Sequence, residues 1–118
     1  MTTLTLSYKG VSIKEYELTG ERVTVGRHSD NDIQLDDPTV SGVHAVFSLV
    51  PDPYFDGQLH ATLVDFNSTN GVFVNGERVK QQRLRSGDII RIGEHELLFD
   101  QQGGSPFDRT AVLLRDEE

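Results

Sequence analysis

Three polar loops carry the side chains that suit an anionic ligand. The loops span residues 26–33, 36–45 and 65–76. Arg27 in the first loop offers a rigid fork of five N–H donors, which suits phosphate or carboxylate. Ser41 in the second loop offers a hydroxyl, and Asn70 in the third offers a donor and an acceptor that can hold a peptide backbone. Each loop alone is equally well an ordinary solvated turn, so this interpretation depends on the loops lying together.

A hydrolytic enzyme is one alternative interpretation of these loops. Ser41, His44 and Asp65 have the side-chain types of a catalytic triad. The sequence has neither a nucleophile elbow nor a P-loop lysine motif. If a strand began by Ser41, positions three apart would point to opposite faces, which opposes a Ser41–His44 pair. We therefore expect no enzymatic activity.

A calcium or magnesium site is a second alternative. The hard-ion ligands that cluster here are Asp30, Asp32, Asp36 and Asp37. The glycine and terminal glutamate of an EF-hand loop are missing, and the absence of cysteine excludes a thiolate metal site. Because a solvated acidic surface explains the cluster more simply, we expect neither a metal nor a cofactor.

The composition predicts one globular domain. The chain has 118 residues, of which 36% are hydrophobic and 25% are charged, and it has no cysteine. A chain of this length holds a single core, and no apolar run approaches the length of a membrane span. Residues 1–20 lack the basic start and apolar middle of a signal peptide, which favours the cytoplasm.

The charge balance excludes two classes of partner. The net charge is −8, from 11 basic and 19 acidic residues. Nucleic acids and anionic membranes are bound by clustered lysine and arginine, and this chain has no such cluster. Any anionic ligand must therefore be held by a local positive group against the field of the whole domain.

Short alternating segments predict an all-β fold. The alternation over residues 4–13 resumes out of phase further on, which indicates a bulge near Lys14–Glu15. Further strands are expected at residues 23–25, 33–35, 44–50, 59–66, 72–74, 89–92 and 96–99. Both faces of residues 44–50 carry apolar groups, so this strand is expected to be central, with His44 near its start. The frequent turn signals favour an antiparallel β-sandwich or barrel.

Two Asn-Gly pairs lie close together, at Asn70–Gly71 and Asn75–Gly76. Each pair is typical of a type I′ hairpin turn. Only residues 72–74 separate them, which makes a very short strand. One of the two pairs is therefore expected to do something other than join two ordinary strands.

The sequence divides into a domain over residues 1–100 and a flexible or linker-like tail over residues 101–118. Residues 103–106 form a Gly-Gly-Ser-Pro break. A helix capped by Asp108 is one interpretation of residues 107–115, although the acidic end would oppose its dipole. We assign the tail no structure.

Several short motifs occur in a fixed order along the chain. They are Gly26-Arg27, Asn31-Asp32-Ile33, residues 37–41, His44-Ala45, residues 68–71, residues 74–76, Leu84, Gly87-Asp88 and Ile92-Gly93. One motif alone is a weak signal, whereas the ordered set with these spacings is specific. The set resembles the forkhead-associated (FHA) domain family, and the resemblance covers residues 4–99.

This resemblance implies a two-sheet antiparallel β-sandwich of about eleven strands, with ligand loops at one end. It implies a phosphothreonine-dependent peptide-binding module in Ser/Thr kinase signalling, whose partners are a phosphothreonine-containing protein and an upstream Ser/Thr kinase. By matching motif position, Arg27 would pair with the phosphate and Ser41 would donate its hydroxyl to it. Thr69 would line the phosphothreonine pocket, and Asn70 would hydrogen-bond the peptide backbone.

The resemblance gives other motif residues structural roles. His44 would brace the loops without touching the ligand, and Asn75–Gly76 would form a turn. The implied structural set is Gly26, His44, Gly71, Asn75 and Gly76.

Two residues depart from the family pattern. Many members carry a basic or polar side chain directly after the serine, where this chain has Gly42, so only the Gly42 backbone N–H can contact phosphate. Many also carry threonine after the Asn-Gly pair, where this chain has Val72, which affects packing more than binding. His28 is in a position to supplement Arg27, and a neutral His28 is the alternative.

Two hypotheses concern the partner. Thr110, with an apolar residue three positions on, is a candidate phosphosite that the same domain or a second copy would read, and this would permit self-association through a phosphorylated tail. Thr2 and Thr3 are lesser candidates, and an ordinary linker threonine is the alternative. The alternative function is a phosphate-independent protein-interaction sandwich.

Overall fold

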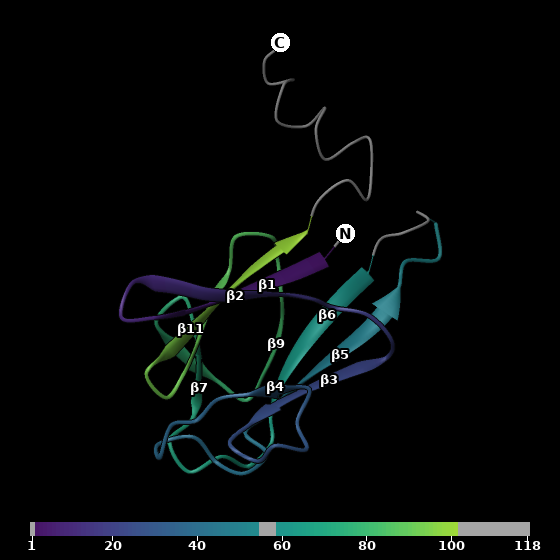
Figure 1. Cartoon of the computed structure of the whole chain (residues 1–118). Helices are drawn as coiled ribbons and strands as arrows, with labels where there is room; N and C mark the ends of the chain where they lie inside the picture. The colour runs from purple at the N-terminus through teal and green to yellow at the C-terminus, as the bar shows by residue number, and fades with distance from the viewer. Residues whose placement is uncertain (1, 55–58, 102–118) are drawn as a thin grey trace.

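The computed structural model describes residues 2–54 and 59–101, which form eleven strands and no helix (Figure 1). The strands are β1 (Thr2–Tyr8), β2 (Val11–Glu17), β3 (Arg22–Gly26), β4 (Ile33–Gln34), β5 (Ala45–Pro51), β6 (Leu59–Asp65), β7 (Val72–Val74), β8 (Glu77–Val79), β9 (Gln81–Arg83), β10 (Ile89–Ile92) and β11 (His95–Gln101). One sheet has the order β2-β1-β11-β10-β7-β8, and the other has the order β4-β3-β5-β6-β9. The predicted eleven-stranded, two-sheet architecture is confirmed.

The central position of β5 follows from its sequence. β5 lies between β3 and β6 in the five-stranded sheet and pairs antiparallel with both. The predicted central position is confirmed, but only one face of the strand is fully buried: Phe47 and Leu49 are buried, whereas Val46 is partly exposed and Val50 is exposed. The strand begins at Ala45, so His44 lies just before it. The short pair of β3 with β4 is parallel, unlike the other strand pairs described.

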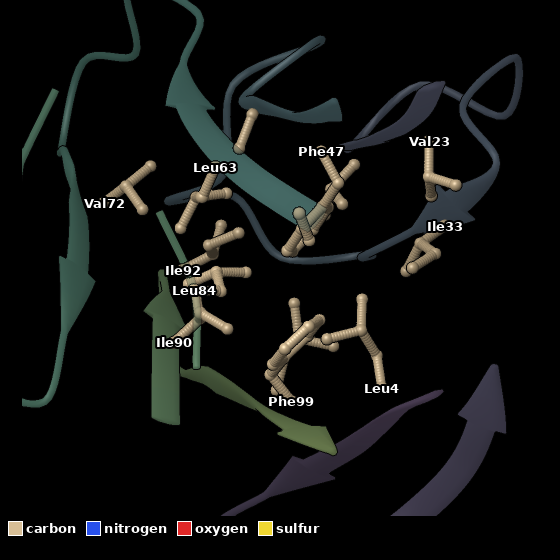
Figure 2. Packing of buried hydrophobic residues seen from close by; sticks show 14 of the residues in the cluster. Leu4, Val23, Ile33, Phe47, Leu63, Val72, Leu84, Ile90, Ile92 and Phe99 are labelled. Carbon is tan, nitrogen blue, oxygen red and sulfur yellow. The ribbon is translucent and has the colours of Figure 1, made fainter. Parts of the chain in front are cut away.

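Alternate side chains of the two sheets point inward and form a single core (Figure 2). Leu4 and Phe99 pair across β1 and β11, and both are buried. Phe47 and Leu63 pair across β5 and β6 and have no exposed surface. Truncating such a buried phenylalanine costs about 3–5 kcal/mol of stability. The core therefore fixes the strand ends from which the loops emerge.

Two strands were not predicted. β8 and β9 lie at the outer edges of the two sheets, and most of their residues are exposed. An edge strand without a buried face needs no alternation of apolar and polar residues, so its sequence carries no period-two signal.

The bulge in β2 lies slightly earlier than expected. Leu6 pairs with Lys14 and Ser7 pairs with Ser12, which leaves Ile13 without a partner opposite. The bulge therefore falls at Ile13, next to the predicted Lys14–Glu15 position.

The two Asn-Gly pairs adopt different turns. Asn75 and Gly76 have φ angles of 51° and 88°, which is the type I′ pattern, and they join β7 to β8. At the other pair only Gly71 has a positive φ, of 88°, so the type I′ prediction for Asn70–Gly71 is wrong. That pair ends the loop that enters β7, which confirms that one pair serves another purpose.

The two ends of the described region lie side by side. Thr2 pairs with Gln101 across β1 and β11, so the folded region reaches one residue past the expected boundary at residue 100. This end lies opposite the loops that follow β3, β4 and β6 (Figure 1). Thr2 and Thr3 are buried in β1, so these lesser candidate phosphosites are inaccessible in the fold. Thr110 and the rest of the predicted tail after Gln101 lie outside the described residues.

The described residues form no helix that is both long and apolar enough to cross a lipid bilayer.

Candidate functional site

Two glycines allow the first and second loops to touch. A Cβ added to Gly26, the last residue of β3, would lie 2.2 Å from the carbonyl oxygen of Gly42. Because the obstacle is backbone, no larger residue fits at Gly26 without moving the loop. Asn31 then ties the two loops together, since its Nδ2 donates to the carbonyl oxygens of His28 at 2.8 Å and Gly42 at 2.7 Å.

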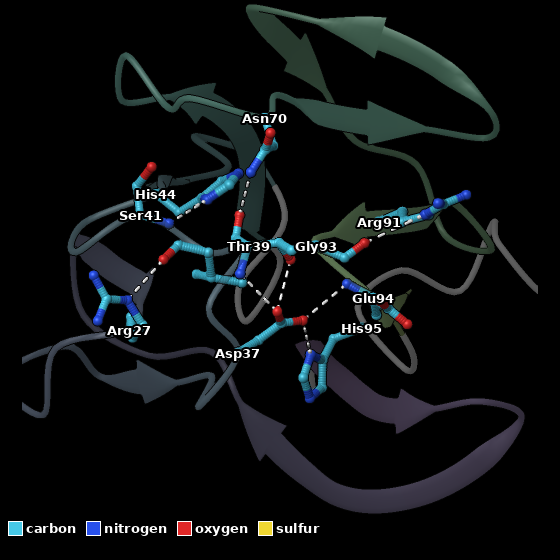
Figure 3. A network of polar contacts seen from close by, with 11 residues as sticks. Arg27, Asp37, Thr39, Ser41, His44, Asn70, Arg91, Gly93, Glu94 and His95 are labelled. Atoms are coloured by element: carbon cyan, nitrogen blue, oxygen red, sulfur yellow. Dashed lines mark hydrogen bonds and ion pairs between the residues drawn. The ribbon is translucent and has the colours of Figure 1, made fainter.

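Arg27 is held beside the second loop by its backbone and its side chain. Its backbone N–H donates to the carbonyl oxygen of Ser41 at 2.9 Å. Its Nε donates to the carbonyl oxygen of Val40 at 3.1 Å (Figure 3). The side chain is exposed, and its two Nη atoms have no hydrogen-bond partner among the described residues. The guanidinium is therefore oriented, with its outer donors free for a ligand.

His44 braces the second and third loops from inside. It has no exposed surface, and its Nδ1 accepts the backbone N–H of Ser41 at 3.0 Å. Because that N–H can only donate, the ring proton is on Nε2, which donates to the carbonyl oxygen of Gly71 at 2.8 Å. Both ring nitrogens are thus occupied by backbone groups, and the predicted bracing role agrees with this geometry.

These contacts do not assemble a catalytic triad. His44 meets the backbone of Ser41 rather than its hydroxyl. The carboxylate of Asp65 accepts the backbone N–H of Ser68 at 2.8 Å, and neither ring nitrogen of His44 is left to bond to it. Residues 41–44 are a loop rather than a strand, so the alternation argument against the pair does not apply, and the hydrogen bonds provide the reason instead.

The third loop joins the second loop through two hydrogen bonds. The backbone N–H of Thr69 donates to Ser41 Oγ at 3.2 Å, which leaves the serine hydroxyl proton free to donate outward. The Nδ2 of Asn70 donates to the carbonyl oxygen of Thr39 at 2.8 Å (Figure 3). This bond orients the carboxamide, and its Oδ1 has no partner among the residues that the structure describes.

Asp37 and Thr39 support the site, although the sequence did not single them out for it. Asp37 Oδ1 accepts both the backbone N–H of Thr39 at 2.8 Å and its hydroxyl at 2.6 Å. Asp37 Oδ2 accepts the backbone N–H of Glu94 at 3.0 Å and lies 3.4 Å from His95 Nδ1. The sequence signal that could have identified this role of Asp37 is the Asp-Pro-Thr segment, because an aspartate side chain in a turn often accepts the backbone N–H of the residue two positions later. Asp37 thus fixes Thr39, whose carbonyl in turn holds Asn70.

The environment of Asp37 changes its pKa in a definite direction. Burial alone would raise the pKa, but the bonds from the Thr39 hydroxyl, from the N–H groups of Thr39 and Glu94, and the nearby His95 outweigh burial and lower it from 3.8 to about 2. A pKa lower in the folded state than in the unfolded state means that the ionised carboxylate stabilises the fold above about pH 4. That stabilisation, about 2 kcal/mol, is lost as the pH falls from about 4 to 2.

We therefore expect Asp37→Asn to lower the free energy of unfolding by about 2 kcal/mol at neutral pH, because an amide cannot accept on both sides. The loss should be much smaller near pH 2, where the wild-type carboxyl is half protonated. Urea denaturation at both pH values measures the difference. Asp36→Asn, at an exposed neighbouring position, is the matched control and should have little effect at either pH. Equal stability of Asp37→Asn and wild type at neutral pH would contradict the assignment.

The four loop aspartates that suggested a cation site do not converge. Asp37 is engaged as described, and Asp32 Oδ2 accepts the backbone N–H of Thr24 at 2.9 Å. Within residues 2–54 and 59–101, no three His, Asp or Glu side chains are grouped so that they could hold a metal ion.

A surface pocket of about 540 Å³ opens beside Asn70 and Thr39. Its other lining residues are Lys9, Gly10, Phe73, Arg91, Gly93, Glu94 and Glu96. An aromatic ring and charges of both signs line this pocket, so it can accommodate both apolar and charged groups.

The structure gathers all five predicted ligand residues, Arg27, Ser41, Gly42, Thr69 and Asn70, at one end of the sandwich. Each of the three loops is hydrogen-bonded to another, and together they present a guanidinium, a hydroxyl and a carboxamide. An eleven-stranded sandwich whose polar loops converge at one end has the arrangement of a binding module that carries its site on loops held by a rigid scaffold.

The chain belongs to the FHA domain family. The family model described as FHA domain matches residues 23–93, which is more than half of the chain.

Known proteins similar to this chain agree with the assignment. An oxoglutarate dehydrogenase inhibitor of Corynebacterium jeikeium is 43% identical over 82 residues, covering 70% of this chain and 52% of the relative. An FHA domain solved in a study of phosphothreonine-dependent FHA domain interactions has a TM-score of 0.72 and 33% identity, covering 86% of this chain and 97% of that chain. Mycobacterium tuberculosis EmbR in complex with a low-affinity phosphopeptide has a TM-score of 0.70 and 34% identity, covering 87% of this chain and 25% of that chain. The chain spans about half the length of the curated relatives it matches.

Proposed function

We propose that this chain is a phosphothreonine-dependent peptide-binding module. The observation that supports the proposal best is the linked set of outward donors on three loops: the Arg27 Nη atoms, the Ser41 hydroxyl and the Asn70 carboxamide. Family membership supports it independently, as do the solved relatives that concern phosphothreonine-dependent interactions and a bound phosphopeptide.

The phosphate binds where the first two loops meet. A phosphothreonine carries about −1.5 to −2 charges at pH 7, and each hydrogen bond to a charged group contributes roughly 1.5–3 kcal/mol. Arg27, the Ser41 hydroxyl and the Gly42 N–H supply these bonds; the Gly42 N–H has no partner among the described residues. Association entropy cancels several kcal/mol of this gain, so the expected dissociation constant is on the order of micromolar.

The peptide backbone binds at the third loop. Asn70 is held by Thr39 and uses its free Oδ1 and remaining N–H on the peptide next to the phosphothreonine. Thr69 lines the pocket for the phosphothreonine itself. Peptide residues that flank the phosphothreonine reach the pocket lined by Phe73 and Arg91, where an apolar side chain can contact the ring and an acidic side chain can contact the guanidinium.

The molecule acts by binding rather than catalysis, and its partners are phosphorylated proteins, including an upstream Ser/Thr kinase. Two observations support a non-catalytic role: His44 has both ring nitrogens bonded to backbone, and a similar relative is an inhibitor of an enzyme. We also propose that the folded binding module ends near Gln101, where β11 ends.

The direct test compares peptides that differ only in phosphate. A pool of phosphothreonine peptides with randomised flanking positions, and the same pool without phosphate, are titrated against the protein by calorimetry or fluorescence anisotropy. Phosphate-dependent binding supports the proposal. Equal binding of both pools would instead establish the alternative, a phosphate-independent interaction sandwich.

Asn70→Ala is expected to weaken phosphopeptide binding by about tenfold to a hundredfold, because the carboxamide contacts backbone common to every peptide. The loss should be similar across peptide sequences, and the fold should be retained because the side chain is exposed. Anisotropy titrations with several peptides check this. The control is Asn67→Gly at an exposed asparagine of the same loop, where glycine tolerates the φ of 57°. A loss confined to one peptide sequence would contradict a backbone contact.

A further inference from the structure

The space beside Gly42 is filled by another residue of this chain. A Cβ added to Gly42 would lie 2.5 Å from Cδ2 and 2.7 Å from Nε2 of the His28 imidazole. The ring therefore packs directly against the bare backbone of the glycine that comes after Ser41. Any side chain at position 42 would compete with the ring for this place.

The backbone holds His28 in this position on both sides. Its N–H donates to the carbonyl oxygen of Gly42 at 3.2 Å, and its own carbonyl accepts Asn31 Nδ2 at 2.8 Å. The Nδ2 of Asn31 also donates to the carbonyl oxygen of Gly42, so His28 is joined to the second loop both directly and through Asn31. The imidazole itself is exposed and has no hydrogen-bond partner among the described residues.

We infer that the His28 imidazole is a phosphate ligand that takes the place of the side chain Gly42 lacks. The inference rests on the proposed function. An anion bound by the Gly42 N–H and the Ser41 hydroxyl lies next to a ring that is packed on Gly42. A protonated imidazole at this place gives the phosphate a second cationic N–H donor, in addition to the Arg27 guanidinium.

Few charged side chains lie on the segments around His28. Arg27 is the neighbouring cation in the same loop. Residues 39–43, packed against the ring, contain no ionisable side chain, and neither do residues 66–71 of the third loop. Asp30 follows two residues later in the same loop, and Asp32 accepts the backbone N–H of Thr24. A bound phosphate is thus the main negative charge available to His28 from the ligand side.

The test compares wild type with His28→Gln, which keeps a neutral donor. Affinity for a phosphothreonine peptide selected from the pool above is measured at pH 8 and at pH 6. The phosphate itself gains a proton near pH 6, and that effect is common to both proteins. We expect similar affinities at pH 8 and about tenfold tighter binding by wild type at pH 6. His60→Gln is the control, because His60 pairs with Val50 at the other end of β5.

Gly42→Ala gives an independent check, since its methyl group displaces the ring. Gly42→Ala should bind the phosphopeptide at pH 6 about as weakly as His28→Gln does. A His28→Gly, Gly42→Arg double variant should bind the phosphopeptide, but its affinity should lack the pH dependence that His28 contributes. Equal pH dependence of wild type and His28→Gln would overturn the inference and leave the proposed function standing. Failure of wild type to bind any phosphopeptide of the pool would overturn the proposed function.

Discussion

Arg27→Ala is expected to abolish phosphate-dependent peptide binding, with at least about a hundredfold loss of affinity. The variant removes two outward Nη donors and the full positive charge nearest the proposed phosphate position. The fold should remain within about 1 kcal/mol of wild-type stability, because the side chain is exposed and contributes one hydrogen bond, to Val40. Calorimetric titration with a phosphorylated and an unphosphorylated peptide measures the first effect, and urea denaturation measures the second.

Arg27→Lys separates charge from geometry. Lysine keeps the positive charge but lacks both the Nε bond to Val40 and the paired donors of the guanidinium. Its affinity should fall between those of wild type and the alanine variant. Arg22→Ala, an exposed arginine at the start of β3, should bind as wild type does. Full phosphate-dependent binding by Arg27→Ala would refute the proposed role of Arg27.

His44→Ala is expected to have the largest effect on stability, lowering the free energy of unfolding by about 3–5 kcal/mol. The substitution leaves a cavity and strips two backbone groups, the Ser41 N–H and the Gly71 carbonyl, of their buried partner. An unsatisfied buried group costs about 1–3 kcal/mol. Phosphopeptide affinity should also fall, because the second and third loops lose the bond that holds them in register.

Chemical denaturation of both His44→Ala and His60→Ala measures this effect. His60 is partly buried in β6, and its Nε2 donates to Asp52 at 2.8 Å. His60→Ala therefore removes the same side chain, with a hydrogen bond of its own, at a place away from the three loops. The control should lose much less stability and keep its affinity. If the free energies of unfolding of His44→Ala and His60→Ala were equal, the hydrogen bonds of His44 to Ser41 and Gly71 would not stabilise the fold as expected.

Most strands that the sequence predicted bury one face, although the predicted alternation also covers β2, whose residues are mostly exposed. Val72–Val74 and Ile89–Ile92 lie where the alternation of side chains placed them, because burial of every second residue leaves a period of two. Glu77–Val79 and Gln81–Arg83 were missed for the same physical reason: these edge strands are held mainly by backbone pairing and bury little. Backbone hydrogen bonds leave no pattern of residue types.

The candidate site was predictable in its parts but not in its supports. The order and spacing of motifs identified Arg27, Ser41 and Asn70, and the structure brings them together. The role of Asp37 depends on the N–H of Glu94, 57 residues further on, which no local pattern indicates. Likewise, the ring of His28 lies on Gly42 only because Gly26 lets the two loops approach.

The pairing of Thr2 with Gln101 governs how this domain can be combined with others. The start of β1 and the end of β11 lie at one end of the sandwich, and the loops of the proposed site lie at the other end (Figure 1). A reporter, a surface anchor or a second domain that is joined next to Thr2 or Gln101 would therefore lie away from the proposed binding loops. Tandem copies of the domain that are linked in this way would each keep the proposed binding loops accessible to a ligand.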